Sequence, residues 1–369
     1  MRCLWFLFST VWGLTNSSTW AVLVGTSRFW VNYRHYSNAL SFYRVLKRLG
    51  VPDGQIVLML GDEAACDPRN VQPGRIWNAD RRHDKLDLYG EDVEVDFRSG
   101  EVTVDNFLRV LSGKQFEFTP TNQRLSTDKH SNLLIYLTGH GGNDFLKFRD
   151  FEEVQSKDII DAIRTLKEQN KFNEILLIVD TCQAETLVED IDIPGVITMS
   201  SSQLNQSSWA SNYSSHLGVS TVDNWSYHLY RFLQLKVTDP CSPVTLQDAF
   251  TFAKRAASKN GLVATPTMRT TDGVRDPRDI RVTEFFSNPL TASCSSPPTI
   301  AVPPADNALD WLETSLPHDM LHYDIDWSPT VDVAPENVPF TAPIPCLALS
   351  LAVLSLFYCT LSSILRRIT

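Results

Sequence analysis

A cysteine follows a short apolar run in the middle of the chain. Residues 175–179 read ILLIV, which is typical of a strand buried on both faces, and Cys182 comes shortly after them. Reactive groups in open α/β sheets gather at the carboxyl ends of strands, where the loops diverge into a crevice. A cysteine considered alone is more often a buried, inert residue. A nucleophilic role for Cys182 therefore requires a partner base.

A candidate base stands upstream of this cysteine. Residues 132–143 read NLLIYLTGHGGN, a second apolar strand that is followed by His140 between glycines. Flanking glycines leave the backbone free and the imidazole uncrowded, which suits a side chain that faces a substrate. Cysteine and a sequence-distant histidine form a recognised nucleophile and base pair. The sequence therefore predicts that Cys182 is a thiol nucleophile and His140 its base.

Strands and helices are expected to alternate along the chain, which favours an α/β fold with an open, mostly parallel sheet flanked by helices. The expected strands are residues 20–26, 56–60, 93–97, 132–138, 175–179 and 196–200. Start and stop signals predict helices at residues 38–49, 104–111, 157–170, 224–235 and 245–258. Both candidate catalytic residues then follow the carboxyl end of a strand.

Composition separates a globular body from the ends of the chain. The chain has 369 residues, 43% of them hydrophobic, which is enough for one large core. Its formal net charge of −10 argues against a nucleic-acid-binding surface. Residues 287–345 hold 11 of the 20 prolines but no Lys or Arg, so they are predicted to be an extended acidic linker. The catalytic body is expected at residues 19–286.

Two apolar segments bracket the chain. Residues 1–18 fit a secretory signal peptide. Residues 346–365 are uncharged and long enough to span a bilayer as a helix. The basic tail at 366–369 is then cytosolic and the body lumenal, as in a single-pass type I protein. A cleaved lipid-anchor signal is the alternative, and the retained basic tail argues against it.

Sequons and cysteines agree with a secretory route. Three N-x-S sequons are candidate glycosylation sites: Asn205, Asn212 and Asn224. Four cysteines lie outside the apolar ends: Cys66, Cys182, Cys241 and Cys294. If Cys182 is a free nucleophile, an odd number remains, which favours an intermolecular disulfide or a second free thiol.

Several long stretches between residues 20 and 286 carry a family resemblance. They read SRFWVNYRH, VLKRLGVPDGQIVLML, YGEDVEVDFRS, VTVDNFLRVLSG, LTGHGGNDFLKF and IVDTCQA. They resemble the catalytic subunits of glycosylphosphatidylinositol (GPI) transamidases, which are related to the legumain cysteine peptidases of family C13. The resemblance implies a caspase-like fold in which three strand ends converge on one site.

The resemblance also implies roles for individual residues. Cys182 would be the nucleophile, His140 its base, and Asn32 the residue that orients the imidazole without adding a buried charge. The backbone N–H groups of Gly141 and Cys182 would stabilise the oxyanion. No cofactor is required for this chemistry.

Arg34 and Gln183 are the residues expected to contact substrate. Legumains hold asparagine side chains with an arginine and an acidic residue that follows the cysteine. This chain keeps Arg34 but has Gln183 and Ala184 after Cys182. Because the acid is missing there, small residues are expected at the cleavage site. A solvated surface charge is the alternative for Arg34.

A structural calcium site and an intersubunit disulfide are two further implications of the resemblance. Asp53, the Ile56 carbonyl, Glu94 and Asp96 match the family's calcium positions, and hard oxygen ligands suit Ca²⁺. Glu94 and Asp96 are expected on one face of a strand, where exposed acids are the alternative reading. Cys66 corresponds to a cysteine that tethers a partner subunit.

The predicted function is that of one subunit of a membrane-anchored transamidase complex in the endoplasmic reticulum. The thiol would attack the C-terminal signal of a proprotein, and the ethanolamine amine of a preformed GPI lipid would resolve the thioester. A legumain-type asparaginyl endopeptidase, with water as acceptor, is the alternative enzyme. A non-catalytic assembly subunit is the alternative of another class, and the intact Asn32, His140 and Cys182 argue against it.

Overall fold

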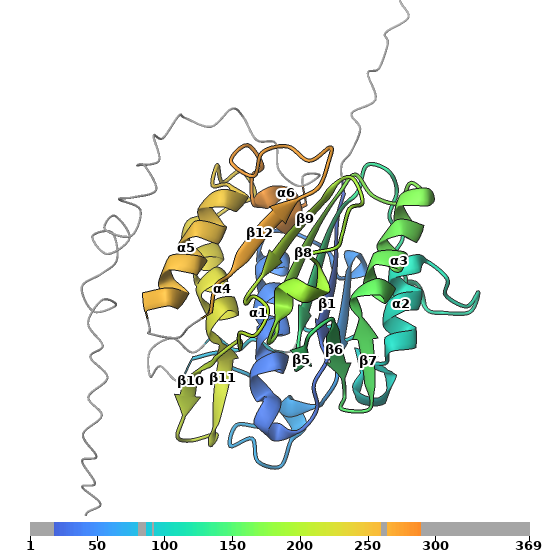
Figure 1. The fold of residues 1–369 in the computed structure, drawn as a ribbon. Helices are drawn as coiled ribbons and strands as arrows, with labels where there is room; N and C mark the ends of the chain where they lie inside the picture. The colour runs from blue at the N-terminus through green and yellow to red at the C-terminus, as the bar shows by residue number, and fades with distance from the viewer. Residues whose placement is uncertain (1–17, 80–85, 91, 260–263, 289–369) are drawn as a thin grey trace, which may run out of the picture. The chain divides into compact units, whose positions relative to one another are not determined.

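A seven-stranded sheet forms the centre of the computed structural model, which describes residues 18–79, 86–90, 92–259 and 264–288. Its strands are β1 (Thr19–Gly25), β2 (Ile56–Leu60), β3 (Phe97–Arg98), β4 (Asn132–Thr138), β8 (Glu174–Asp180), β9 (Val196–Ser200) and β12 (Thr267–Thr270). They lie in the order β12-β9-β8-β4-β1-β2-β3, all parallel except β12 (Figure 1). The predicted open, mostly parallel α/β sheet is therefore confirmed.

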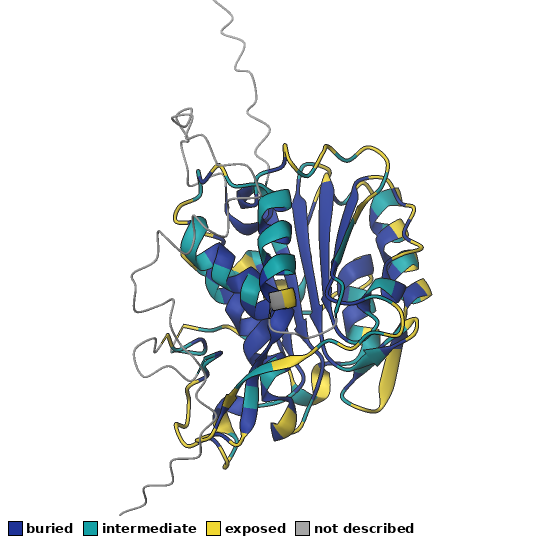
Figure 2. Ribbon diagram, turned by 60° about the vertical axis from the view of Figure 1, so that its left-hand side comes forward, coloured by how far each residue is buried: buried dark blue, intermediate teal, exposed yellow. Residues whose placement is uncertain are grey.

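Helices cover both faces of this sheet. One face packs on α1 (Tyr33–Arg48), α4 (Asn224–Lys236), α5 (Leu246–Lys259) and α6 (Thr283–Phe286), and the other on α2 (Val104–Ser112) and α3 (Ser156–Glu168). Alternate residues of β1 enter the two cores, Leu23 on the first side and Val24 on the second. The central strands are consequently buried on both faces, as their continuous apolar runs predict (Figure 2).

Two small antiparallel sheets, which sequence reasoning missed, flank the strand ends. One consists of β10 (Ala210–Ser214) and β11 (Val219–Asp223), and the other of β5 (Gly141–Gly142), β6 (Phe145–Phe148) and β7 (Glu152–Gln155). Strand β5 continues directly from the loop after β4. These strands are short and partly polar, so they give no clear alternating pattern.

Two expected elements differ from the structure. Helix α1 begins at Tyr33, earlier than the expected residue 38, directly after the 3₁₀ turn η1 (Trp30–Asn32). The expected strand at 93–97 is wrong, because only Phe97 and Arg98 pair with β2. The carboxylate of Asp96 accepts the N–H of Leu58 at 2.8 Å, so a side chain occupies a place that a strand carbonyl would fill.

The ends of the chain lie outside the described residues. These ends include the predicted signal peptide, most of the acidic linker, the predicted membrane span and the basic tail. Among the helices that the structure does describe, none is long and apolar enough to cross a membrane.

Candidate active site

The register of two neighbouring strands brings the predicted nucleophile and base to one edge of the sheet. Thr138, at the end of β4, pairs with Asp180, at the end of the parallel strand β8. His140 and Cys182 each lie two residues beyond this pair. Asn32 follows β1, the neighbour of β4 on its other side, through the turn η1.

Asn32 contacts the imidazole of His140. Its Oδ1 lies 2.8 Å from His140 Nε2, and its Nδ2 donates to the carbonyl of Arg28 at 2.6 Å. The second bond fixes which way the buried amide faces. Because Oδ1 can only accept, Nε2 must carry the ring proton of the neutral imidazole, and the lone pair is then on Nδ1. Nδ1 is thus the atom able to receive a thiol proton.

Cys182 is a free, half-buried thiol whose backbone N–H is open. The N–H groups of Thr181, Gln183 and Ala184 each donate to acceptors in residues 201–206. The N–H of Cys182 has no hydrogen-bond partner among the described residues. Gln183 has the left-handed φ of 56°, so the chain turns sharply after the cysteine. The open N–H can stabilise a developing oxyanion.

Gly141 lies where the loop of β4 meets the loop of β8. A Cβ atom at this position would stand 2.6 Å from Thr181 Oγ1 and 2.7 Å from the carbonyl oxygen of Phe145. Only glycine therefore allows the residue after His140 to approach the residue before Cys182 so closely.

Arg34 is paired with an acid that sequence reasoning did not identify. Its Nε donates to Asp223 Oδ1 at 3.0 Å, and its side chain is only 15% exposed, so it is not a solvated surface charge. Asp223 ends β11, distant in sequence from Cys182. The acidic partner of Arg34 is thus a residue of another segment, while Gln183 Oε1 accepts the N–H of Asn205 at 3.1 Å. In the sequence, Asp223 has the features of an ordinary helix N-cap, and nothing there marks it as the partner of Arg34.

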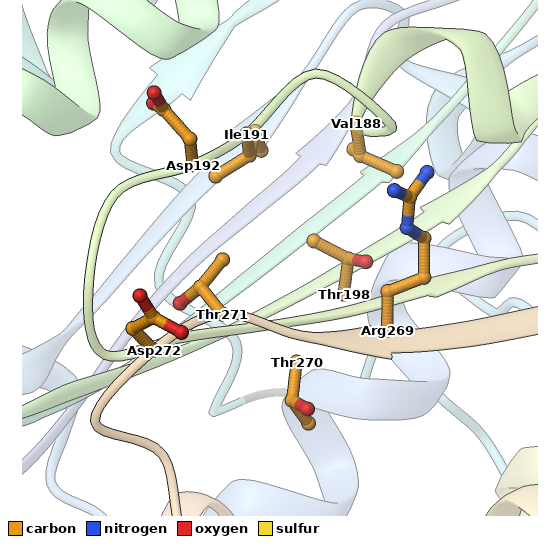
Figure 3. A pocket seen from close by; sticks show the side chains of 8 residues that line it. All are labelled: Val188, Ile191, Asp192, Thr198, Arg269, Thr270, Thr271 and Asp272. Carbon is orange, nitrogen blue, oxygen red and sulfur yellow. The ribbon is translucent and has the colours of Figure 1, made fainter.

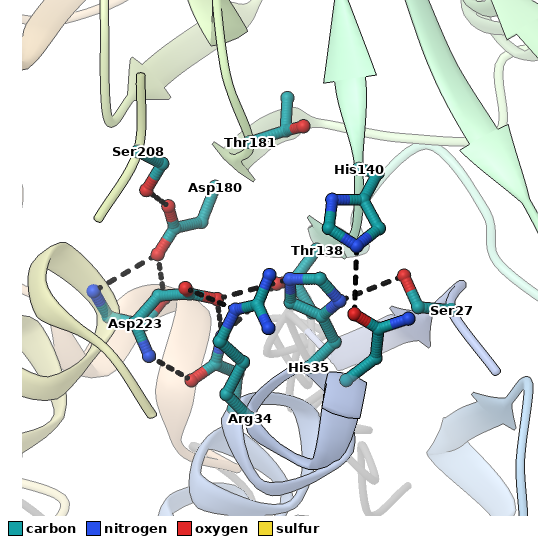
Figure 4. Close-up of polar contacts among 12 residues, drawn as sticks. Ser27, Arg34, His35, Thr138, His140, Asp180, Thr181, Ser208 and Asp223 are labelled. Carbon is teal, nitrogen blue, oxygen red and sulfur yellow. Dashed lines mark hydrogen bonds and ion pairs between the residues drawn. The ribbon is translucent and has the colours of Figure 1, made fainter. Parts of the chain in front are cut away.

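Asp223 belongs to a buried polar network beneath the site (Figure 4). Its Oδ2 accepts from Asn38 Nδ2 at 2.6 Å and lies 3.5 Å from His35 Nε2. The ring of His35 meets that of His140 edge to face, with centroids 5.0 Å apart. Burial and the nearby charge of Asp180 together raise the pKa of Asp223 to about 7, against the opposing effects of Arg34 and Asn38.

His140 is held in a cationic environment. Burial lowers its pKa below the usual 6.5, and the charges of Arg34 and Lys147 lower it further, while Asp150 acts in the opposite direction. A neutral imidazole is the form that can accept a proton, so this environment favours a base.

The predicted calcium ligands are partly engaged by other groups. The carboxylate of Asp53 accepts from Tyr43 and pairs with Lys47. Burial raises the pKa of Asp96 to about 7, and the charges of Glu94 and Asp53 contribute to the rise. Within the described segments, no group of three or more His, Cys, Asp or Glu side chains is arranged to hold a metal.

The remaining predicted residues are Cys66 and the three sequon asparagines. Cys66 is a free, exposed cysteine at the end of the turn η3 (Ala64–Cys66), while Cys241 is disulfide-bonded. Among the sequons, Asn205 is exposed and Asn212 half-buried. Asn224 is 4% exposed and its amide donates to the carbonyl of Ala257, so the structure argues against a glycan there.

A cavity of about 210 Å³ lies elsewhere, beside the edge strand β12 (Figure 3). Its lining residues are Val188, Ile191, Asp192, Thr198, Arg269, Thr270, Thr271 and Asp272. None of the predicted site residues borders it, so it is not the candidate active site.

Comparison with known proteins gives clear matches. Residues 19–269 match the peptidase C13 family. The GPI-anchor transamidase of Saccharomyces cerevisiae is 45% identical over 74% of this chain and 65% of its own length. The human GPI-anchor transamidase is 43% identical over 74% of this chain and 67% of its own. The chain thus spans about two thirds of these relatives.

Similarity to solved structures is weaker. Caspase-1 from Spodoptera frugiperda gives a TM-score of 0.40 at 11% identity, covering 69% of this chain and 87% of the caspase. That score is too low to assign the fold by itself.

The charge environment of His140 predicts a pH dependence. Activity should fall when the pH drops through the lowered pKa of His140, because the protonated ring cannot act as base. Arg34→Gln removes a cation that lowers this pKa, so the acidic limb of the kcat/KM profile should move to higher pH. Arg269→Gln, on exposed β12, is the matched control and should leave the limb in place. An unchanged limb in Arg34→Gln would contradict this account.

Proposed function

The chain belongs to the peptidase C13 family, and on that premise we propose that it is the catalytic subunit of a GPI-anchor transamidase. The relatives carrying that name support the activity. The observation that carries the proposal is the placement of His140 and Cys182 at equivalent positions on adjacent parallel strands, with Asn32 bonded to the imidazole.

The first half-reaction cleaves the C-terminal signal of a proprotein. His140 Nδ1 takes the proton of Cys182, and the thiolate attacks the carbonyl carbon at the attachment site. The oxyanion faces the N–H of Cys182 and, as proposed, that of Gly141. The C–N bond then breaks, His140 returns the proton to the departing amine, and the acyl group remains as a thioester.

The second half-reaction transfers the acyl group to a GPI lipid. Its ethanolamine amine attacks the thioester, a C–N bond forms and the C–S bond breaks. His140 takes a proton from the attacking nitrogen and gives it to the Cys182 thiolate, which restores the thiol. No oxidant, reductant or metal enters this balance, so no cofactor is required for the chemistry.

One observation favours a second candidate, an asparaginyl endopeptidase. Arg34 engages Asp223 through Nε and the carbonyl of Val31 through Nη1, so its Nη2 is free among the described residues to donate to the oxygen of a carboxamide. In this candidate water replaces the amine as acceptor. The choice between the two therefore depends on the acceptor and not on the nucleophile.

An assay with hydrazine distinguishes these functions. The assembled complex, given a signal-bearing proprotein, is expected to release a hydrazide, because an open thioester reacts with a small amine. Cys182→Ala and His140→Ala should each lower the rate by roughly 10⁶-fold, as removal of an acting nucleophile or base does. Cys66→Ser is the control that keeps hydrazide formation. Hydrolysis at a rate unaffected by hydrazine would instead establish the endopeptidase, and full activity of Cys182→Ala a non-catalytic subunit.

The proposed setting is the membrane of the endoplasmic reticulum, as a single-pass type I protein with a lumenal body. The partners are the other subunits, the proprotein signal and the lipid, with no role for nucleic acid. Exposure supports Asn205 as a glycosylation site, and Asn212 stays a weaker candidate.

Cys66 is proposed to form a disulfide with a partner subunit, because it is exposed and free. Non-reducing electrophoresis of the complex should show a larger species that Cys66→Ser abolishes. Activity should persist in that variant, since Cys66 has no role in the proposed acyl transfer. A monomeric band in the unsubstituted protein would contradict the link.

Calcium is proposed to bind at Asp53, Ile56, Glu94 and Asp96. Burial, with a contribution from the charges of Glu94 and Asp53, raises the pKa of Asp96, and a bound cation would stabilise the carboxylate. The ion pair of Asp53 with Lys47 opposes binding. Saturating Ca²⁺ is expected to raise the melting temperature by roughly 2–4 °C. Asp53→Asn should abolish the shift, while the exposed Asp276→Asn should keep it. An equal shift in both variants would place the effect elsewhere.

A further inference from the structure

A cationic and aromatic surface borders the catalytic histidine. Apart from the effect of Lys147 on the pKa of His140, it has no part in the mechanism described so far. It consists of Arg28, Phe29, Lys147, Arg149 and Phe151 and is called the cationic rim below. Its two rings are open to solvent, with Phe29 51% and Phe151 69% exposed. The rim adjoins the site through the backbone, because the carbonyl of Arg28 accepts from Asn32, and the N–H of Lys147 donates to the carbonyl of His140.

The guanidinium of Arg28 lies between these two rings. Its Cζ is 4.2 Å from the ring centroid of Phe29 and 4.4 Å from that of Phe151. Stacking of this kind holds the plane of the guanidinium and leaves its N–H edge available. No described residue accepts a hydrogen bond from the Arg28 side chain, and its closest carboxylate oxygen, on Asp150, is 3.9 Å from Nε. A planar set of donors is therefore fixed in place without an acceptor.

Lys147 and Arg149 add two further charges without partners. In the described part of the chain, neither side chain makes an ion pair or donates a hydrogen bond, although Arg149 Nε is buried. Arg149 lies on the same ring as Arg28, with its Cζ 6.0 Å from the Phe151 centroid. By contrast, Arg44 and Arg109 are each paired with an aspartate at 2.7 Å. Two carboxylates adjoin these three cations, that of Asp150 and that of Glu153, which stands opposite Lys147 in the β6–β7 ladder. The rim therefore keeps an excess of positive charge in a chain of net charge −10.

The backbone of the rim is held in unusual conformations. Phe29 has φ 74° and ψ 143°, a combination that is disfavoured for every residue with a Cβ. Arg149 and Asp150 follow each other with φ of 49° and 66° in the loop between β6 and β7. Strained residues of this kind are found at ligand clamps, where the surrounding structure holds them in place.

We propose that the cationic rim is an anion subsite that binds a phosphate group of the acyl acceptor, close to the amine that resolves the thioester. The inference rests on the proposed transamidase function and specifies which part of the acceptor the site holds. A planar guanidinium with free donors is complementary to phosphate oxygens. The two additional cations are complementary to the negative charge of a phosphate, which a peptide backbone does not carry. An apolar peptide segment would cover the rings but desolvate three cations, of which only Arg28 has a carboxylate of the described residues at ion-pair distance.

The test compares three amines as acceptors in the assembled complex: hydrazine, ethanolamine and phosphoethanolamine. Phosphoethanolamine is expected to reach its half-maximal rate at a concentration about tenfold or more lower than that of ethanolamine. A charge-assisted hydrogen bond to the phosphate raises affinity by about this factor. Arg28→Gln and Arg149→Gln should remove this preference while hydrazide formation persists. The ratio of two acceptors in one sample is independent of how much of the variant is folded.

The matched control is Arg109→Gln, since Arg109 also stacks on an exposed ring, that of Phe116 at 4.8 Å, but outside the site. It should keep the preference. Inorganic phosphate should compete with phosphoethanolamine in the unsubstituted protein but not slow hydrazide formation, which separates a bound headgroup phosphate from a general anion effect. Equal use of ethanolamine and phosphoethanolamine, or a preserved preference in both rim variants, would overturn the subsite. Absence of hydrazide from the unsubstituted complex would overturn the transamidase function itself.

Discussion

The parallel register of β4 on β8 is the constraint on which the candidate site depends. Thr138 opposite Asp180 places His140 and Cys182 at the same distance past their strand ends. A slip of one residue would turn one of the two side chains to the other face of the sheet, because strand side chains alternate with a period of two. Both strands are buried on both faces, so a slip would also move apolar side chains between two separate cores. The packing of the body thereby fixes the spacing of the reacting groups.

Apolar packing stabilises the body, whereas the burial of polar groups beneath the site lowers its stability. Asp223 is enclosed near Asp180, and its pKa of about 7 lies above the ordinary value of 3.8. The folded protein therefore holds a proton on Asp223 between these values that the unfolded chain has released. Stability linked to this group decreases as pH rises through that interval, because the carboxylate must then be charged inside the protein. Arg34 and Asn38 limit the decrease by pairing with the charge.

The parts of the structure that sequence reasoning identified are those with strong local signals. The strands β1, β2, β4, β8 and β9 have continuous apolar runs, and most helices have clear start and stop residues. The hairpin β10–β11 gave no such signal, and with it the partner of Arg34 was missed, since Asp223 reaches the site only through tertiary packing. The expected strand at 93–97 failed for a related reason. One acid of the alternating run, Asp96, bonds through its side chain to the backbone of β2, and a pattern of residue types does not distinguish this contact from a strand ladder.

The choice of a neutral amide beside His140 fits chemistry in which the imidazole must accept a proton twice. A carboxylate in place of Asn32 would stabilise the imidazolium, whereas the carboxamide oxygen orients Nε2 without a full charge. Arg34 and Lys147 shift the balance further toward the neutral ring. In the proposed mechanism, His140 takes the thiol proton and later the proton of an attacking amine. Because the pKa of the ring is lowered, the ring gives each proton up readily. Lys147 lowers this pKa and also belongs to the cationic rim, so the proposed acceptor subsite and the base share one charged side chain.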